Sequence, residues 1–380
     1  MVEYIIVLLV LLYGCIHYDV KGNLDTKNRW LYFEWLVLVL LAGLRYKVGG
    51  DSIAYYNEFY SQWPTLSEVG TYDNERYNIL WIYFIAICKS IIDEFWFLQI
   101  VHAVIVNTVF FRFFKKHTTY IYTAILFYFI LYFFRYNTEV LRASLAVCSF
   151  LIGFEFLSKK KWIYYFTCCL VAYGFHSEAI VTFFFPLILP LQKIRITGFS
   201  VAMILAVTIV LLFSINLIPF VGSLLGSGKF GEAFAYYSNT NDNVSAIGYI
   251  YSFITQLPFI YMLWQYKYRE SDIFKAFCIL YVVAAIQSLN YTNLISRSMD
   301  FVYPLMLVLL MNTFRQPLSE ITGIRKNNNL LMAMMVFILL FGAVRYFSVD
   351  NHWLLFYPYY SIFNPVDVPL REQIFFEYFN

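Results

Sequence analysis

The sequence predicts an all-α fold, a polytopic bundle of transmembrane helices, and composition is the main reason. Hydrophobic residues make up 61% of the 380 residues and charged residues 13%, with a mean hydropathy of +0.63. A soluble domain carries about 25% charged residues, so this chain has too little polar material to cover a surface in water. Within a bilayer, a helix satisfies its backbone hydrogen bonds internally. The aromatic content of 22% suits the many interfacial positions of a chain that crosses repeatedly.

Apolar runs recur along the whole chain, without an internal repeat, a low-complexity tract or a soluble appendage. A crossing helix needs roughly 20 apolar residues. We therefore expect about 11 to 13 membrane segments, including short or re-entrant helices, in a single integral membrane domain of residues 1–380. The candidate segments are residues 2–18, 30–45, 78–92, 95–114, 119–134, 139–157, 162–175, 177–191, 199–218, 247–266, 273–290, 299–315 and 330–347.

Basic residues in short loops predict the orientation, because they stay on the cytoplasmic side. The basic loops assigned to the cytoplasm contain Lys21, Lys115, Lys159, Lys193, Lys267 and Arg325. Loops 46–76 and 219–246 and the tail 348–380 are then outside. Two crossings between residues 46 and 114 would put loop 46–76 and Lys115 on one side. Either one element there is re-entrant or a third enters the membrane, and the short segment 78–92, which carries Lys89, is the suspect.

The sequence lacks the usual signatures of several functional classes. The net charge is +3 and no basic arm is present, which argues against nucleic-acid binding. The six cysteines lie in apolar runs without C-x-x-C spacing, and no H-E-x-x-H motif occurs, so neither a disulfide framework nor a metal site is indicated. We expect no cofactor. The first apolar run lacks a positive n-region, so we interpret it as a retained crossing.

A polar, glycine-rich and aromatic stretch follows the second apolar segment. It contains Arg45, Gly49, Gly50, Asp51 and Tyr55. Paired glycines permit a tight turn and let a ligand approach the backbone, although the spacing matches neither a Walker loop nor a dinucleotide fingerprint. The stretch is either one wall of a binding site or a plain turn beside a snorkelling arginine.

Charged residues within a membrane segment are costly and mark a functional site or an ion pair. Arg135, Glu139 and Arg142 have i, i+4 and i+7 spacing, so they share one face if this stretch is helical. They form either a structural network or an anion site in which Glu139 orients the arginines. Arginine suits the second role, because its planar guanidinium binds two phosphate oxygens at once.

His176 separates two apolar runs at an outer helix end and precedes Ser177 and Glu178. It is either an ordinary hydrogen-bonded polar residue or a general base toward a sugar hydroxyl, a task that the pKa of histidine suits at neutral pH.

Arg297 belongs to a polar stripe with spacings of three and four, which places its members on one helical face. A hydrated cavity wall and a polar seam between two helices explain the stripe equally well. Its members are Gln287, Asn290, Asn293, Arg297 and Asp300.

These residues resemble a known family. Arg45, Gly50, Asp51 and Tyr55 resemble the Arg…Gly-Asp…Tyr signature of EpsG-type proteins, which belong among the Wzy-like polymerases of exopolysaccharide, capsule and O-antigen repeat units. The run 142–146, the basic turn 159–161 and the Phe-His-Ser element at 175–177 are similar to central elements of the same family. The likeness covers most of the chain in hydropathy and order, but only these motifs in residues.

The resemblance implies a membrane glycosyltransferase that joins polyprenyl-pyrophosphate-linked oligosaccharide units into surface polysaccharide, at the outer face of the bacterial inner membrane. Donor and acceptor are of the same type, no nucleotide sugar or metal is needed, and a chain-length regulator is a further candidate partner beside membrane lipid. On this reading His176 or Asp51 deprotonates the acceptor hydroxyl. The groups expected to bind pyrophosphate or glycan are Arg45, Arg135, Arg142, Arg297, Glu139 and Tyr55.

Other classes also fit a polar, cationic membrane cavity. A flippase for lipid-linked sugars should carry charge reachable from both faces and pseudo-repeated halves, whereas here the charge is biased to one face. An O-antigen ligase would share the donor chemistry but use a lipid A core as acceptor, and a membrane acyltransferase is likewise polytopic. A scaffold of a polysaccharide assembly complex would need only structural charges. The bias to one face and the lack of a repeat favour the polymerase.

Overall fold

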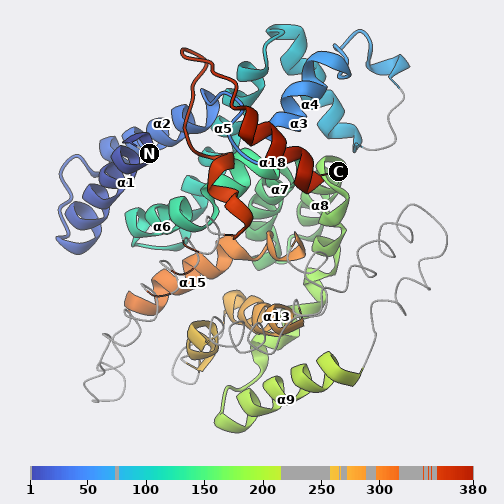
Figure 1. Cartoon of the computed structure of the whole chain (residues 1–380). Coiled ribbons are helices and arrows are strands. Elements are labelled where there is room, and N and C mark those ends of the chain that lie inside the picture. The colour runs from blue at the N-terminus through green and yellow to red at the C-terminus, as the bar shows by residue number, and fades with distance from the viewer. Residues whose placement is uncertain are drawn as a thin grey trace. The chain divides into compact units, whose positions relative to one another are not determined.

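The computed structural model describes residues 2–72, 77–214, 257–264, 266, 272–287, 297–315, 337, 341, 344 and 349–379 (Figure 1). Over these residues the chain is helical and has no β-strand, only an isolated antiparallel bridge between Arg45 and Ser361. The all-α prediction is confirmed. The chain divides into two compact units, Met1–Thr182 with Val336–Asn380, and Phe183–Met335. The single integral domain stays a prediction. The expected loop 219–246 and stripe residues Asn290 and Asn293 lie outside the described residues.

The first unit holds most of the described helices, with η marking 3₁₀ and π helices. They are α1 (Val2–Gly14), η1 (Cys15–Val20), α2 (Lys27–Gly43), α3 (Ser52–Ser61), η2 (Val69–Thr71), α4 (Ile79–Ile91), α5 (Phe95–His117), α6 (Ile121–Tyr128), η3 (Phe129–Phe133), η4 (Arg135–Glu139), α7 (Leu141–Ser158), α8 (Trp162–Phe175), η6 (Val349–Leu355) and α18 (Pro369–Phe379).

The second unit contains α9 (Gly198–Ser214), α13 (Ile273–Gln287) and α15 (Tyr303–Arg315). The segment 177–191, expected as a short apolar helix, belongs to the 3₁₀ helix η5 (Ser177–Lys193), which contains Pro186 and Pro190. Proline removes a backbone donor and disrupts an α-helix interior, which accounts for the difference.

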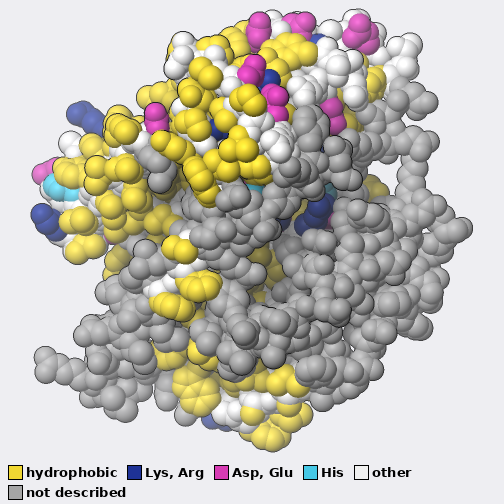
Figure 2. All heavy atoms as spheres, in the orientation of Figure 1, with side chains coloured by type: hydrophobic (Ala, Val, Ile, Leu, Met, Phe, Trp, Pro, Cys, Tyr) yellow, Lys and Arg dark blue, Asp and Glu magenta, His cyan; other side chains and the backbone are white. Residues whose placement is uncertain are grey.

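Three described helical stretches are long and apolar enough to cross a membrane: Val2–Val20, Phe95–His117 and Leu141–Ser158. Shorter apolar helices include α4 and α8. Large apolar side chains stay exposed on these helices, for example Ile163 at 82%. Figure 2 shows hydrophobic side chains over much of the described surface, and acidic side chains gathered at the end that carries α3, α4 and α18. Such a surface suits a bilayer and not water.

Helix α5 is the centre of the first unit and sets the direction of its neighbours. Gly43, at the end of α2, packs on Ile100 near the start of α5, and Lys115 Nζ donates to Asn28 Oδ1 (3.2 Å) at the opposite end. Thus α2 and α5 are antiparallel. We call the end where α2 finishes and α5 begins the Gly43 end, and the other the Lys115 end.

Helix α7 runs parallel to α5, and α8 returns antiparallel to α7. The first relation follows from His102 Nε2, which lies 2.8 Å from Ser144 Oγ, and from the Phe113 and Phe154 rings near the far end, whose centroids are 5.8 Å apart. The second follows from the 2.8 Å bond that Ser149 Oγ donates to the carbonyl of Cys168. The start of α7 and the end of α8 are therefore both at the Gly43 end.

Helix α4 begins and ends at the Gly43 end. At its start, Asn78 Nδ2 donates to the Tyr173 carbonyl (2.9 Å) in the last turn of α8. In its last turn, Lys89 Nζ donates to the Phe59 carbonyl of α3 (2.7 Å), shortly before the chain enters α5 at Phe95. This is the arrangement that a re-entrant segment requires. With α4 not crossing, α5 is the single crossing between residues 46–94 and Lys115. Loop 46–76 and Lys115 then lie on opposite sides of the membrane, as the basic loops predict.

Candidate functional site

Arg142 is the centre of a polar cluster in the first turn of α7. Its Nε donates to the phenolic oxygen of Tyr55 (3.4 Å), and its guanidinium carbon lies 4.7 Å from the centroid of the Tyr77 ring. Asp51 is close enough to interact electrostatically with it. Both Arg142 and Asp51 are half-buried. The structure thus brings three predicted residues, Asp51, Tyr55 and Arg142, into one cluster.

Helix α3 positions its part of this cluster by simple periodicity. Asp51 occupies the N-cap, its carbonyl accepts the N–H of Tyr55 (3.0 Å), and Glu58 follows about one turn later. The Tyr77 hydroxyl donates to the Glu58 carboxylate. Burial raises the pKa of Tyr55, so its phenol stays neutral at physiological pH although Arg142 acts in the opposite direction. Arg142 is therefore packed between two tyrosines that α3 holds in place.

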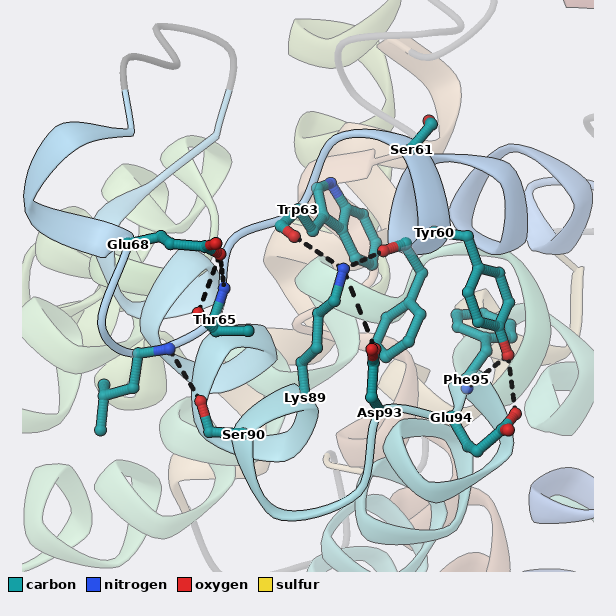
Figure 3. Close-up of polar contacts among 12 residues, drawn as sticks. Tyr60, Ser61, Trp63, Thr65, Glu68, Lys89, Ser90, Asp93, Glu94 and Phe95 are labelled. Atoms are coloured by element: carbon teal, nitrogen blue, oxygen red, sulfur yellow. Dashed lines mark hydrogen bonds and ion pairs between the residues drawn. The ribbon is translucent and has the colours of Figure 1, made fainter.

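The far end of α3 is anchored by Lys89 of α4, as Figure 3 shows. Its Nζ donates to the carbonyls of Phe59 (2.7 Å) and Trp63 (2.9 Å) and lies 3.9 Å from the Asp93 carboxylate. A cation at the C-terminal end of a helix satisfies free carbonyls and opposes the helix dipole. This explains the charge within segment 78–92 and fixes the helix that carries Asp51 and Tyr55.

The glycine turn before α3 packs directly on η4. Gly49 has a φ of +108°, and a Cβ there would lie 2.5 Å from Thr138 Cβ. A Cβ on Gly50 would lie 3.3 Å from Glu139 Oε1. Only glycine combines this backbone conformation with so close a neighbour. The close approach predicted for the paired glycines is thus made by η4 of the same chain.

Arg45 holds this turn from inside. Its side chain is 1% exposed, and its Nε donates to the Val48 carbonyl (3.2 Å) and its Nη1 to the Ala42 carbonyl. Among the described residues its Nη2 has no hydrogen-bond partner. The contacts show Arg45 closing the chain between α2 and α3. Its predicted part in substrate binding stays a prediction.

Glu139 faces a histidine that was not among the predicted site residues. Its Oε1 lies 3.7 Å from Nε2 of His352 in η6, with side chains 12% and 30% exposed. The shared face predicted for Arg135, Glu139 and Arg142 required one continuous α-helix. Instead η4 is a π-helix, and Val140, between η4 and α7, has a non-helical backbone conformation.

His176 follows the last residue of α8, also at the Gly43 end. Ser149 of α7 contacts Cys168 of α8. Arg142 lies about two helical turns before Ser149, and Phe175 lies about two turns after Cys168. Because the two helices are antiparallel, Arg142 and Phe175 are at the same end of the pair. The His176 ring is mostly buried, and its Nδ1 accepts the backbone N–H of Glu178 (3.2 Å) and lies 3.8 Å from the Glu178 carboxylate.

The remaining predicted arginines are Arg135 and Arg297. Arg135 is the first residue of η4, and its carbonyl accepts the N–H of Val140 (3.0 Å). Arg297 belongs to the second unit, where its carbonyl accepts the N–H of Asp300 (3.2 Å). Their roles in binding stay predictions.

A family model described as the EpsG family matches residues 28–361. The chain belongs to the EpsG family. This confirms the resemblance drawn from the Arg45–Tyr55 stretch and from His176. Membership, together with the apolar helices, indicates a membrane protein with a polymerase-like role in exopolysaccharide biosynthesis. No curated protein and no solved structure is significantly similar to the chain.

In this EpsG family protein, three residues of the candidate site were not predicted from the sequence. Glu58 had a usable signal, because it lies three residues after Tyr55 and seven after Asp51, on the same face of α3. Tyr77 and His352 had none, since their partners are distant in the sequence. Within the described part of the chain, no group of three or more His, Cys, Asp and Glu side chains could hold a metal ion.

Proposed function

We propose that this EpsG family protein is a Wzy-like polymerase. It joins polyprenyl-pyrophosphate-linked oligosaccharide units at the outer face of the bacterial inner membrane. The observation that carries the proposal is the half-buried Arg142, held between Tyr55 and Tyr77 beside Asp51 at the Gly43 end. Lys115 at the end of α5 and Lys159 at the end of α7 mark the opposite end as cytoplasmic.

The reaction needs a cation for the leaving group and a base for the acceptor. A hydroxyl oxygen of the acceptor sugar bonds to the anomeric carbon of the donor, and the bond from that carbon to the pyrophosphate oxygen breaks. Polyprenyl pyrophosphate leaves with the electron pair. Arg142 stabilises the charge that develops on it, as a preorganised guanidinium does well. The acceptor proton passes to a base, for which the sequence offers His176 or Asp51.

Tyr55 and Tyr77 keep the Arg142 guanidinium in one orientation. A side chain with this much rotational freedom loses little additional entropy on binding when it is already held. Arg45, Arg135, Arg297 and Glu139 are further proposed contributors to pyrophosphate or glycan binding.

The test is a glycan gel from producing cells whose own copy of the gene is replaced by variants. Arg142→Ala is compared with Arg112→Ala, which removes an exposed arginine of α5 near the Lys115 end. We expect Arg142→Ala to give single repeat units at the surface and no long chains, and Arg112→Ala to give a normal ladder, at equal protein levels. A normal ladder from Arg142→Ala overturns the proposal. Loss of single units from the surface points to a flippase instead.

A further inference from the structure

The C-terminal segment 349–379 is bound to the glycine turn by backbone contacts. Tyr46 N–H donates to the Tyr360 carbonyl (2.8 Å) and Ile362 N–H to the Leu44 carbonyl (2.9 Å), on either side of the bridge at Arg45. Gly49 N–H donates to the carbonyl of Leu355 in η6 (3.0 Å). The turn that leads into Asp51 is therefore held from one side by the far end of the chain.

Side chains of α18 also stabilise the contact between the C-terminal segment and the glycine turn. Arg371, 1% exposed, donates from Nη1 to the Lys47 carbonyl (2.9 Å) and from Nε to the Leu354 carbonyl (3.1 Å). Lys47 Nζ in turn lies 2.7 Å from Asp367 and 3.1 Å from Glu372. The family match ends at residue 361, so the Arg371, Asp367 and Glu372 contacts lie beyond the matched part of this chain.

This attachment places His352 beside the glycine turn. Leu355, about one turn after His352, lies against Gly50, and Glu139 lies against Gly50 as well. His352 and Glu139 then face each other across 3.7 Å beside the turn that carries Asp51. At 30% exposure, the His352 side chain is more accessible than the 11% exposed side chain of His176.

We propose that His352 is the base of the transfer reaction and that Glu139 is its positioning residue, an inference that rests on the proposed function. A carboxylate facing Nε2 favours the tautomer with its proton on that nitrogen and leaves the lone pair on Nδ1. As the acceptor oxygen bonds to the anomeric carbon and the pyrophosphate leaves, the hydroxyl proton passes to Nδ1. His176 then has a structural role at the end of α8, where its Nδ1 accepts the backbone N–H of Glu178.

The test measures polymer formation from endogenous lipid-linked units in membranes of producing cells, with and without added imidazole. The variants are His352→Ala, Arg142→Ala and, as the matched control, His17→Ala. His17 stacks on Tyr13 and bonds to Asn23, near the Lys115 end. We expect His352→Ala to lower the rate about 10²- to 10⁴-fold, the usual contribution of a general base. Imidazole should restore part of the rate, and His17→Ala should match the wild type.

Two results overturn the inference: a His352→Ala rate within about threefold of the wild type, or a loss that imidazole leaves unchanged, because a small diffusible base replaces a proton acceptor but not a packing group. The Arg142→Ala reaction separates this failure from that of the proposed function. If Arg142→Ala is inactive while His352→Ala is active, the polymerase stands and His352 is not its base. If Arg142→Ala is active, the polymerase proposal itself fails.

Discussion

Arg142 Nε lies 3.4 Å from the hydroxyl oxygen of Tyr55, which joins the first turn of α7 to the first turn of α3. The Tyr77 ring covers the guanidinium at 4.7 Å. An arginine stacked on an aromatic ring keeps its full charge and loses rotational freedom. This relationship makes the position of α3 a condition for the site, and the first prediction follows from it.

Replacing Arg142 by lysine should abolish most of the polymer, although the charge is kept. Lysine has no planar fork and cannot bind two pyrophosphate oxygens while it stacks on Tyr77. We expect the amount of long-chain polymer to fall on the order of 10²-fold, measured on a glycan gel and normalised to the amount of protein inserted in the membrane. If Arg142→Lys stays within about threefold of the wild type, charge alone suffices and the proposed geometry is unnecessary.

Gly49→Ala should disable the turn, and Gly70→Ala is its control. A Cβ on Gly49 would lie 2.5 Å from Thr138 Cβ at a φ of +108°, whereas a Cβ on Gly70 meets nothing within 4 Å. The strain is about 1–3 kcal/mol before any clash is counted. We expect a lower melting temperature of the purified protein and at least a tenfold loss of polymer, with Gly70→Ala unchanged. Equal melting temperatures for the two variants would contradict the packing described here.

Lys89→Met should loosen α3. The variant leaves the carbonyls of Phe59 and Trp63 without their charged donor, which lowers the free energy of unfolding by about 1.5–3 kcal/mol. The exposed Lys159 of the α7–α8 turn is the matched control. Thermal unfolding in detergent should show a lower midpoint for Lys89→Met than for Lys159→Met. The same midpoint for both would mean that Lys89 does not anchor α3.

The contact of Lys47 with Asp367 predicts a pH window for the C-terminal segment. The Lys47 amino group holds the pKa of Asp367 below its ordinary 3.8, so this contact stabilises above that pH and is lost as the pH falls through the lowered value. The carboxylates raise the pKa of Lys47 above its ordinary 10.5, so its contribution is lost only as the pH rises through the raised value. Asp367 is 60% exposed, so water and salt screen the pair and the effect is small.

Limited proteolysis of the C-terminal segment measures this contact. We expect protection between about pH 4 and pH 10, and less protection below that window. At neutral pH, Lys47→Glu should expose the segment, because it faces Asp367 and Glu372 with like charge. Adding Asp367→Lys to Lys47→Glu should restore part of the protection. A double variant as sensitive as the single one would exclude a direct contact.

The two ends of α4 should label from the same side of the membrane. In a background without cysteine, single cysteines at Ile79, the first residue of α4, and at Asp93, just after its last residue, should both react with a membrane-impermeant maleimide added outside cells, and one at Lys159 should not. All three positions are exposed, so access to the reagent depends on the side of the membrane. Opposite reactivity of positions 79 and 93 would show that α4 crosses.

The fold class could be predicted from the sequence, and Arg142 and the glycine turn could be singled out as candidates, for physical reasons. Composition alone requires a bilayer, and a charged group such as Arg142 in an apolar segment needs a partner or a function. The turn of Gly49 and Asp51 was visible because only glycine tolerates its conformation.

The partners of these residues could not be predicted in the same way. The helical spacing that grouped Glu139 with Arg135 and Arg142 assumes an unbroken α-helix, whereas η4 is a π-helix and the backbone of Val140 is not helical. The contact of Glu139 with His352 joins distant segments, and no local pattern encodes such a pairing.

The most direct test of the central claim is a double-mutant cycle between Arg142 and Tyr55, with initial rates of polymer formation in membranes of producing cells. Tyr55→Phe removes the oxygen that orients Arg142 and should cost about tenfold, the value of one hydrogen bond to a charged group. Arg142→Ala should cost about 10²- to 10³-fold. If the two residues act as one unit, the double variant is no slower than Arg142→Ala alone. Losses that multiply, or a normal rate for Arg142→Ala, would contradict the account.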